Sequence, residues 1–253
     1  MRVVSLVTEG IERAAKAGCL KWLFAQDADI ICLQDTQCAE HQLRDDAFFP
    51  EGYHPYFLDH YDDPRRNGVA IYCRTLPKAI IWGLGFDGFD SQGLYIQADY
   101  DEFSVGSVLV PGGRGGAKEM ETKLSFLSQF SAHLAKVRQK RRGYILCGGW
   151  ELMSHHADAE DAGNGVALPG LSATERGWLL DLYDSGYADA FKVMDQEPDA
   201  YTWWPDGDEA GGLRTDTQII SELLVDRVSA AKIYDEEAFS HHAPVIIDYD
   251  IRL

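Results

Sequence analysis

Short apolar runs recur along the whole chain, and each has the length of a strand buried in a sheet. The runs are Val3 to Val7, Ile30 to Gln34, Val69 to Cys73, Ala79 to Gly83, Tyr95 to Tyr100, Ser104 to Pro111, Tyr144 to Gly148 and Val245 to Ile251. Only Asp101, Glu102 and Phe103 separate the fifth run from the sixth. This spacing predicts a hairpin, which requires antiparallel pairing. The pattern therefore predicts sheets that contain antiparallel strands.

Helical periodicity fills three of the segments between these runs. Residues Ile11 to Gln26 are predicted to form one helix. A second helix carries an apolar stripe with a spacing of three or four residues, made of Met120, Leu124, Leu127, Phe130 or Ser131, Leu134 and Val137. A third begins at Ser172, whose hydroxyl can cap the first amides while Glu175 reaches back. The mixture predicts an α/β fold in which helices cover two packed, mixed sheets.

Length and composition favour a single domain over residues 1–253. With 253 residues and 45% apolar content the chain can bury a large core, and no linker or repeat interrupts it. No run approaches the roughly 18 apolar residues that span a bilayer, and the first residues already have a strand pattern. We therefore expect a cytoplasmic protein without a membrane segment or a signal peptide.

The cysteines are odd in number and lack the Cys-x-x-Cys spacing of a zinc ribbon. They are Cys19, Cys32, Cys38, Cys73 and Cys147. Because Cys32 and Cys147 lie inside apolar runs, buried thiols are expected there. We assign no cysteine a disulfide, a metal or a catalytic role.

The charge of the chain restricts its partners. The sequence has 23 Lys and Arg residues against 41 Asp and Glu residues, a formal charge of -18. Such a protein repels nucleic acid and anionic membranes, so a phosphate-bearing partner needs a local basic patch. The one dense basic run contains Lys136, Arg138, Lys140, Arg141 and Arg142. It lies at the predicted end of the second helix, where cations also suit the helix dipole, so a contact patch and a plain solvated turn both remain open.

Seven short segments, spread from one end of the chain to the other, carry the motifs of a known kind of site. They are Val4 to Gly10, Leu33 to Thr36, Gly68 to Tyr72, Leu109 to Pro111, Cys147 to Glu151, Leu213 to Asp216 and Ser240 to Pro244. In their order and spacing the whole chain resembles the exonuclease III-like branch of the endonuclease/exonuclease/phosphatase family. The resemblance implies a four-layer αββα sandwich with the site at the strand ends between the sheets.

Phosphodiester hydrolysis in that family uses carboxylates that hold magnesium, an Asp that activates water, and a His with amide donors that stabilise charge on the phosphate. The sequence departs from this pattern at six positions. Val7 and Glu9 replace two amide side chains, and Leu109 replaces a Tyr. Gly149 replaces the water-activating Asp, Glu151 replaces an Asn, and His241 replaces an Asp. The remnants are Asp35, Arg214, Asp216 and His242. Asp216 and His242 are expected to form a buried pair.

These losses predict a chain that does not hydrolyse phosphodiesters. General acid-base help is worth about 10²- to 10⁴-fold and an oxyanion-type donor about 10²- to 10³-fold, and several such groups are missing together. Glu9 and Glu151 also add charge that repels a phosphate backbone. We expect no cofactor and no metal, with Asp35 the only remnant ligand, one methylene shorter than the Glu that the family uses.

Two alternative functions remain open. The main one is a magnesium-dependent nuclease of the exonuclease III type or an abasic-site endonuclease of DNA repair. The other is a scaffold that binds some other protein. Separately, the adjacent histidine pairs at 155–156 and 241–242 could form a substitute metal site with Asp158.

Within the family, several segments resemble the catabolite repression control proteins, a branch with a degenerate site. They are Leu33 to Thr36, Gly83 to Phe86, Tyr95 to Asp99, Gly186 to Ala190 and Trp203 to Asp206. The chain departs from that branch in its first-loop amides and at Thr217. The resemblance implies a non-catalytic, cytoplasmic translational repressor that joins the RNA chaperone Hfq on A-rich messenger leaders. The basic run is then expected to contact RNA or the chaperone in a joint complex, with little independent binding of nucleic acid.

Overall fold

The computed structural model of the chain describes residues 1–253 except 114, 156–169, 171, 195–199 and 206–210. Its helices are α1 (Ile11–Lys16), α2 (Cys19–Ala25), α3 (Ala117–Arg138) and α4 (Ala173–Asp184). Its strands are β1 (Arg2–Val7), β2 (Ile30–Gln34), β3 (His54–Leu58), β4 (Val69–Cys73), β5 (Ala79–Trp82), β6 (Tyr95–Asp99), β7 (Phe103–Leu109), β8 (Gly143–Gly149), β9 (Tyr187–Asp189), β10 (Asp216–Ser221), β11 (Val228–Ile233) and β12 (Val245–Tyr249). Short 3-10 turns lie at Glu40–Gln42, Asp46–Phe48, Asp90–Gln92, Lys192–Met194 and Glu222–Arg227.

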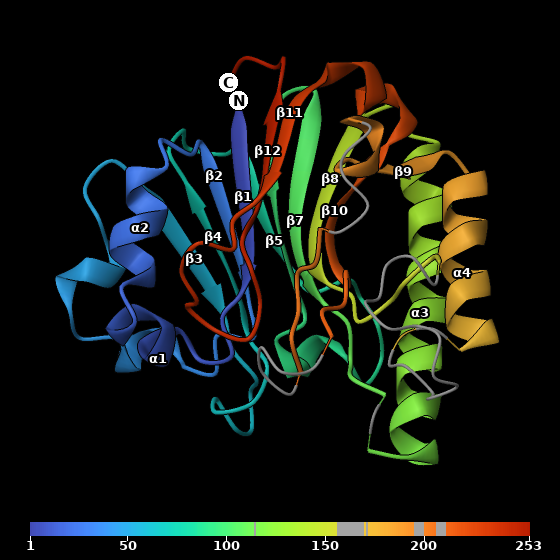
Figure 1. Ribbon diagram of the computed structural model, residues 1–253, viewed down its shortest axis with the longest axis horizontal. Coiled ribbons are helices and arrows are strands. Elements are labelled where there is room, and N and C mark those ends of the chain that lie inside the picture. The colour runs from blue at the N-terminus through green and yellow to red at the C-terminus, as the bar shows by residue number, and fades with distance from the viewer. Residues whose placement is uncertain (114, 156–169, 171, 195–199, 206–210) are drawn as a thin grey trace.

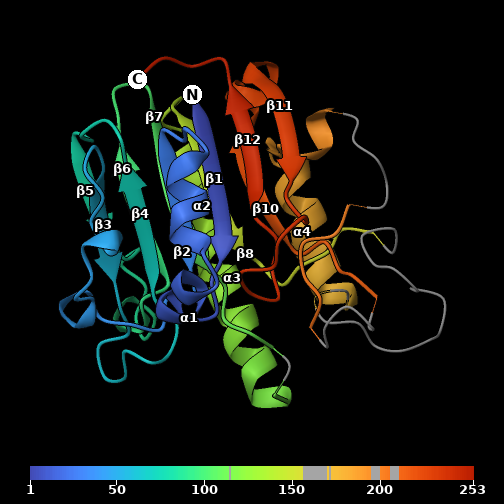
Figure 2. The ribbon, with the colours of Figure 1, turned by 60° about the vertical axis from the view of Figure 1, so that its left-hand side comes forward.

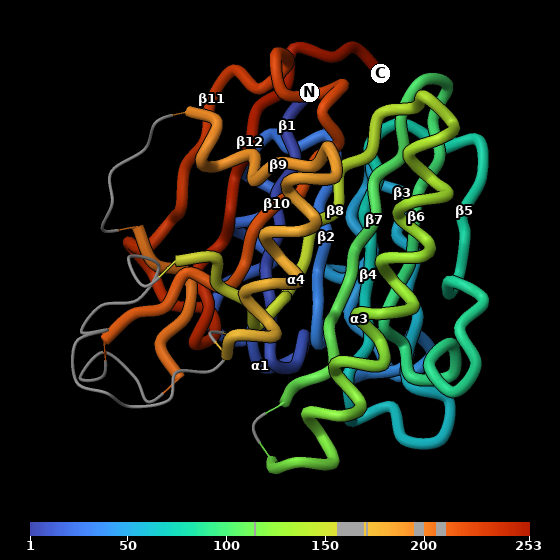
Figure 3. The backbone as a smooth tube through the Cα atoms, turned by 90° about the vertical axis from the view of Figure 1, so that its right-hand side faces the viewer, coloured from blue at the N-terminus to red at the C-terminus, as the bar shows by residue number. Residues whose placement is uncertain are grey.

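Two mixed sheets form the two inner layers. The first has the strand order β11-β12-β1-β2-β4-β3 and the second has the order β5-β6-β7-β8-β10-β9. Helices α1 and α2 cover the outer face of the first sheet, and α3 and α4 cover that of the second (Figures 1 and 3). The predicted four-layer αββα sandwich is therefore confirmed.

Each sheet contains one parallel pair, β1 with β2 and β7 with β8, and its other pairs are antiparallel. A parallel pair needs a crossover connection, which α1 and α2 supply in the first sheet and α3 supplies in the second. Figure 2 shows β1 and β2 side by side beneath α2. As a result, the carboxyl ends of all four parallel strands carry loops that are free to meet at one end of the sandwich.

Apolar side chains of both sheets fill the space between them, and a few buried amides join the sheets there. Gln34 of β2 donates a hydrogen bond of 2.9 Å to the hydroxyl of Ser107 in β7. Gln218 of β10 donates to the carbonyl of Val3 at 3.0 Å and accepts from the Tyr249 hydroxyl at 2.8 Å. Because buried amides are costly unless bonded, these contacts restrict how the two sheets can align.

The predicted strands all occur, with ends within two residues of the predicted ones. The predicted hairpin is confirmed by the antiparallel register of Ala98 with Val105. Four strands were not predicted: β3, β9, β10 and β11. Strand β10 shows why, because its sequence from Asp216 to Ser221 is mostly polar although every residue in it is buried. Its neighbours β8 and β9, which are distant in sequence, provide the partners that make this burial possible.

The prediction of one helix from Ile11 to Gln26 is wrong, because the segment forms two helices separated at Gly18. Gly18 has a φ of 91° in the left-handed region, which interrupts a helix and which glycine adopts without strain. The predicted start of α4 is confirmed: the Ser172 hydroxyl accepts from the Glu175 amide at 3.3 Å, and the Glu175 carboxylate accepts from the Ser172 amide at 3.2 Å. Helix α3 buries most of the predicted stripe, together with Lys123 and Phe126.

All five cysteines are unpaired and buried, and the expected burial of Cys32 and Cys147 is confirmed. In the part of the chain that the structure describes, no helix has both the length and the apolar character needed to cross a membrane. The two termini lie side by side, with the Met1 ammonium donating to the carbonyls of Tyr249 at 2.8 Å and Ile251 at 3.1 Å (Figure 1). They lie at the end of the sandwich opposite to the carboxyl ends of β1 and β8.

Candidate functional site

Eight of the positions that the family resemblance singles out sit at or just beyond one set of strand ends. We call this region the site edge. Val7, Leu109 and Gly149 end β1, β7 and β8, while Glu9, Asp35 and Glu151 follow β1, β2 and β8, and Asp216 and His242 lie on segments that border them. The register places Gly149 beside both Leu109 and Asp216. Tertiary structure thus brings together residues that are distributed over the whole sequence.

Gly149 is the position that the family resemblance matches to the water-activating Asp, and in the structure Val7 and Leu109 occupy the space beside it. A Cβ added at Gly149 would lie 2.7 Å from Cγ2 of Val7 and 3.4 Å from Cδ1 of Leu109. Carbon atoms in contact are normally about 3.5–4.0 Å apart, so a larger residue would displace Val7. Three departures from the family pattern therefore form one apolar contact.

Two further departures satisfy one another. The Glu9 carboxylate accepts a hydrogen bond of 3.0 Å from the His241 amide and lies 2.9 Å from Nδ1 of the same histidine. Arg13 donates to that carboxylate at 3.1 Å. Burial alone would raise the pKa of Glu9, but the His241 amide and the neighbouring cationic groups outweigh it, and the pKa is lowered. Glu9 is therefore an anion at neutral pH.

The expected buried pair is present. Nδ1 of His242 lies 2.6 Å from Oδ2 of Asp216, and both side chains are buried. The His242 ring stacks on Trp203 with 5.4 Å between centroids. Burial alone would lower the pKa of His242, but the charge and hydrogen bond of Asp216 raise it. Among the described residues, Oδ1 of Asp216 is buried and has no hydrogen-bond partner, and it faces Gly149.

Asp35 is the position that the family resemblance matches to a metal-binding Glu. Burial raises its pKa to about 6 and the charge of Glu9 adds to this, while a 2.9 Å hydrogen bond from Gln37 acts in the opposite direction. In the described part of the chain, no group of three or more His, Cys, Asp and Glu residues is arranged to hold a metal ion. His156 and Asp158, which the substitute metal site would need, lie outside the described residues.

Arg214, predicted as a remnant, forms a buried ion pair of 2.7 Å with Asp189 of β9. Its guanidinium lies 5.8 Å from the centre of the Phe191 ring, and Thr217 donates to the same Asp189 carboxylate. These contacts hold β9 and β10 together. Within the described contacts, Arg214 therefore acts in the packing of the second sheet.

Sequence reasoning missed Lys123, which supports the site edge from α3. Its side chain is 1% exposed, and its ammonium donates to the Glu175 carboxylate at 2.6 Å and to the Glu151 carbonyl at 2.8 Å. It thereby joins α3, the first turn of α4 and the segment that follows β8. Its position three residues after Met120 and four before Leu127 places it inside the predicted apolar stripe, and this signal could have identified it.

The basic run lies at the other end of the molecule, in the last turn of α3 and the turn that follows it. Arg138 donates to the Ser185 carbonyl. Arg142 donates to the Phe103 carbonyl at 2.6 Å and to the Ser104 hydroxyl at 2.8 Å, and it also reaches the Tyr100 carbonyl. Lys136, Lys140 and Arg141 are exposed. Part of the predicted patch is therefore structural and part faces solvent.

The chain belongs to the Endonuclease/Exonuclease/phosphatase family, whose sequence model matches residues 10–230. It is 28% identical over 255 residues to the DNA repair nuclease APEX1 of Danio rerio, covering 98% of this chain and 81% of that protein. It is 27% identical over 251 residues to an exodeoxyribonuclease of Bacillus subtilis (strain 168), covering 97% and 98%. An AP endonuclease structure from Archaeoglobus fulgidus superposes with a TM-score of 0.87 at 20% identity, covering 99% of this chain and 100% of that one. The predicted exonuclease III-like relationship is confirmed.

Proposed function

We propose that this chain is a member of the family that does not hydrolyse phosphodiesters. The observation that supports this most directly is the contact at Gly149, where Val7 fills the space of the water-activating carboxylate. A glycine at this position cannot take the proton from an attacking water, a contribution worth about 10²- to 10⁴-fold. The unsatisfied Asp216 oxygen faces this apolar contact rather than a donor.

Charge at the site edge supports the same proposal. Glu9 stands where an uncharged amide is expected, its pKa is lowered, and it is held in place by His241 and Arg13. Glu151 adds a second carboxylate. These anions would make the approach of a phosphate backbone unfavourable.

The more specific role that we propose is translational repression in a complex with the RNA chaperone Hfq and an A-rich messenger. It rests on the segments that resemble the catabolite repression control proteins and on the exposed cations beyond α3. A pull-down from the native host, with and without RNase, tests it. We expect RNA-dependent recovery of the chaperone, and recovery of no chaperone under either condition would exclude this role.

The second candidate is a magnesium-dependent nuclease, and the relatives favour it, because those named above are DNA repair and exonuclease proteins. It requires a metal site, for which Asp35 would be the remaining carboxylate of the motif. It predicts cleavage of abasic or 3'-recessed DNA that EDTA abolishes.

A single cleavage assay separates the two candidates. The chain is incubated with abasic and 3'-recessed duplexes in magnesium and in manganese, with the Bacillus subtilis relative as positive control. We expect product at the level of the protein-free blank. EDTA-sensitive product that is lost in both the Asp35→Ala and the His242→Ala variants would establish the nuclease instead. Requiring both losses guards against a contaminating host nuclease.

A further inference from the structure

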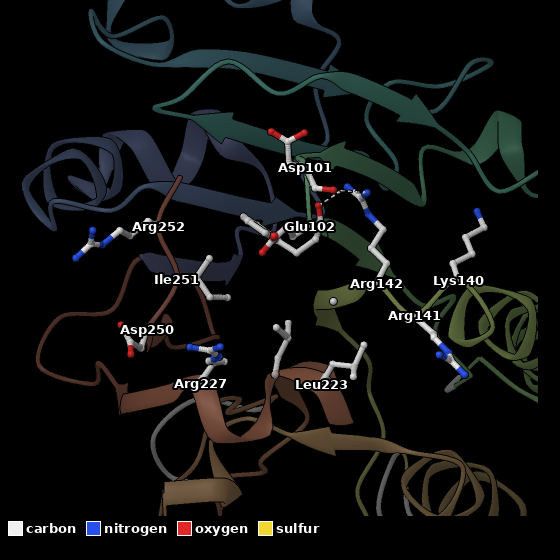
Figure 4. Close-up of a pocket in the computed structure, with 13 residues that line it drawn as sticks. Asp101, Glu102, Lys140, Arg141, Arg142, Leu223, Arg227, Asp250, Ile251 and Arg252 are labelled. Atoms are coloured by element: carbon white, nitrogen blue, oxygen red, sulfur yellow. Dashed lines mark hydrogen bonds between the residues drawn. The ribbon is translucent and has the colours of Figure 1, made fainter.

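Two cavities of the protein differ in the charge of the side chains around them. The larger, about 880 Å³, lies at the end of the sandwich opposite to the site edge, and four exposed cations line it: Lys140, Arg141, Arg227 and Arg252. Figure 4 shows these cations around one hollow. The smaller cavity, about 430 Å³, adjoins the site edge at His242. Among the described residues, no lysine or arginine lines this smaller cavity, which we call the acidic cavity.

The acidic cavity combines aromatic rings with carboxylates. Trp204, Tyr234 and His241 supply the rings, and the exposed Asp235 and Glu237 supply the carboxylates. Among the contacts of the described residues, neither carboxylate forms a salt bridge or accepts a hydrogen bond, although their neighbour in sequence, at position 236, is bonded to a lysine. Two carboxylates without a partner attract a cation, and the formal charge of -18 adds to that attraction.

The site edge contributes further negative charge to the wall of the acidic cavity. The anionic carboxylate of Glu9 lies 2.9 Å from Nδ1 of His241, so a third acidic group stands directly behind one of the lining rings. The family resemblance matches the same end of the sandwich to phosphate chemistry. In this chain the strand ends are therefore bordered by a cavity that suits a ligand of the opposite charge.

Main-chain hydrogen bonds fix the walls of the acidic cavity. The Trp204 amide donates to the His241 carbonyl at 3.0 Å, and the Tyr234 amide donates to the Pro244 carbonyl at 2.9 Å. The Tyr234 ring also packs on Trp22, with 4.4 Å between centroids. In the part of the chain that the structure describes, no other ring stacks on Trp204. A ligand can therefore meet this indole without first ordering the walls.

We propose that the acidic cavity binds a guanidinium group. A guanidinium is planar, stacks on an indole, and pairs with carboxylates through its fork of N–H donors. The volume falls within the range of about 300–1,000 Å³ that is typical of small-molecule sites, so the cavity has room for one arginine side chain. The group belongs either to an arginine of a protein segment or to a free guanidino compound. This inference goes beyond the proposed function and does not depend on RNA binding.

The test follows the indole N–H signals of the isotope-labelled full chain by NMR. The Trp204 signal is identified by its loss in Trp204→Phe, and the salt concentration is about 0.15 M, which screens long-range attraction to the charge of the chain. The probe is acetyl-arginine amide. Its lysine counterpart carries the charge without the fork, and its citrulline counterpart carries a similar shape without the charge. We expect the arginine probe to shift the Trp204 signal and to bind roughly tenfold more tightly than either counterpart.

Two double variants locate the carboxylates that matter. Asp235→Asn with Glu237→Gln removes both unpaired carboxylates of the cavity, and Asp181→Asn with Asp184→Asn removes two exposed carboxylates of α4. Both change the net charge by the same amount. We expect the arginine probe to bind roughly tenfold more weakly to the first variant and to change by less than about twofold in the second. Free arginine is titrated beside the blocked probe, and the tighter of the two identifies the source of the guanidinium.

Three results would overturn the proposal. A Trp204 signal that does not move at the highest probe concentration would exclude the site. Equal binding of the lysine or the citrulline counterpart would show that charge alone or shape alone is recognised. Equal weakening in the two double variants would show that only net charge matters. Since cleavage and recovery of the chaperone are measured separately, failure here would leave the proposed function standing, and failure of the proposed function would leave this site in place.

Discussion

The charged side chains at the two ends of the sandwich differ in whether they are paired within the protein. At the site edge the charged groups satisfy one another, Glu9 with His241 and Arg13, and Asp216 with His242. At the other end four exposed cations surround a cavity without a salt bridge among the described contacts. Groups that are paired inside the protein have little to offer a ligand, whereas unpaired ones retain their full attraction. The two ends of the sandwich therefore differ in how far their charged side chains are already paired within the protein.

The largest effect is expected from the buried lysine that supports the site edge. Lys123→Met leaves the Glu175 carboxylate buried without its partner and removes the bond to the Glu151 carbonyl. We expect the free energy of unfolding to fall by about 3–5 kcal/mol in urea denaturation, because breaking one side of a buried ion pair costs this much. Lys118→Met on the exposed face of the same helix is the matched control, with a change of at most about 0.5 kcal/mol. Equal losses of stability in the two variants would mean that the Lys123–Glu175 ion pair contributes nothing specific to stability.

Adjacent residues of the basic run should differ next most strongly. Arg142→Ala removes bonds from a guanidinium to the carbonyls of Asp101 and Phe103, and we expect a loss of about 2–3 kcal/mol of stability. Arg141→Ala removes no described bond and should leave stability unchanged while weakening the binding of a single-stranded oligoadenylate, which represents the A-rich messenger of the proposed role. The measurements are urea denaturation and the fluorescence anisotropy of a labelled oligoadenylate with the same two variants. If Arg141→Ala were the more destabilising of the two, the division of the basic run into structural and solvent-facing residues would be wrong.

Restoring the missing carboxylate tests the apolar contact at the site edge. Gly149→Asp places a Cβ 2.7 Å from Val7, so we expect a loss of about 1–3 kcal/mol of stability and no cleavage. In a Val7→Ala background, Gly149→Asp should lower the free energy of unfolding by less than it does in the wild type, because the shorter side chain at position 7 leaves space for the Asp. Denaturation of the single and double variants gives this coupling. EDTA-sensitive cleavage by Gly149→Asp at unchanged stability would show a site one substitution away from activity.

The smallest effect concerns Asp35, whose pKa is raised to about 6 by burial. An unfolded Asp titrates near 3.9, so the stabilisation associated with its proton is complete below about pH 4 and is lost as the pH rises through about 6. Asp35→Asn avoids this loss. We expect the variant to be more stable than the wild type by about 1 kcal/mol at roughly pH 7.5, and the difference to shrink at about pH 5.

Magnesium provides the control for that variant. If the family's metal site is gone, adding magnesium chloride should leave the melting temperature of both proteins unchanged. An increase in the wild type that is absent in Asp35→Asn would mean that Asp35 still holds an ion, and it would favour the nuclease candidate.

Most of the sheet framework could be predicted from sequence, because apolar strand runs such as Ile30 to Gln34 are local patterns. Helix ends were harder to predict from the sequence, because the break at Gly18 depends on a backbone conformation that glycine permits but does not require. Strand β10 was not predicted because its polar residues find their hydrogen-bond partners in distant segments, as Gln218 does with the carbonyl of Val3. The Asp216–His242 pair was predictable because the family motifs already placed both residues together.

The sequence alone determined which residues lie at the positions that the family resemblance singles out. It therefore also gave the replacement of the amides, the Tyr and the carboxylates of the family pattern, and the charge of -18. Only the tertiary structure decided what replaced them. Val7 fills the space at Gly149, Glu9 binds His241 across 232 residues of chain, and Arg227 and Arg252 join Arg141 at one cavity. The physical reason is that composition and periodicity are local properties. A contact between distant segments exists only once the chain has closed on itself, and closure is set by the packing of both sheets together.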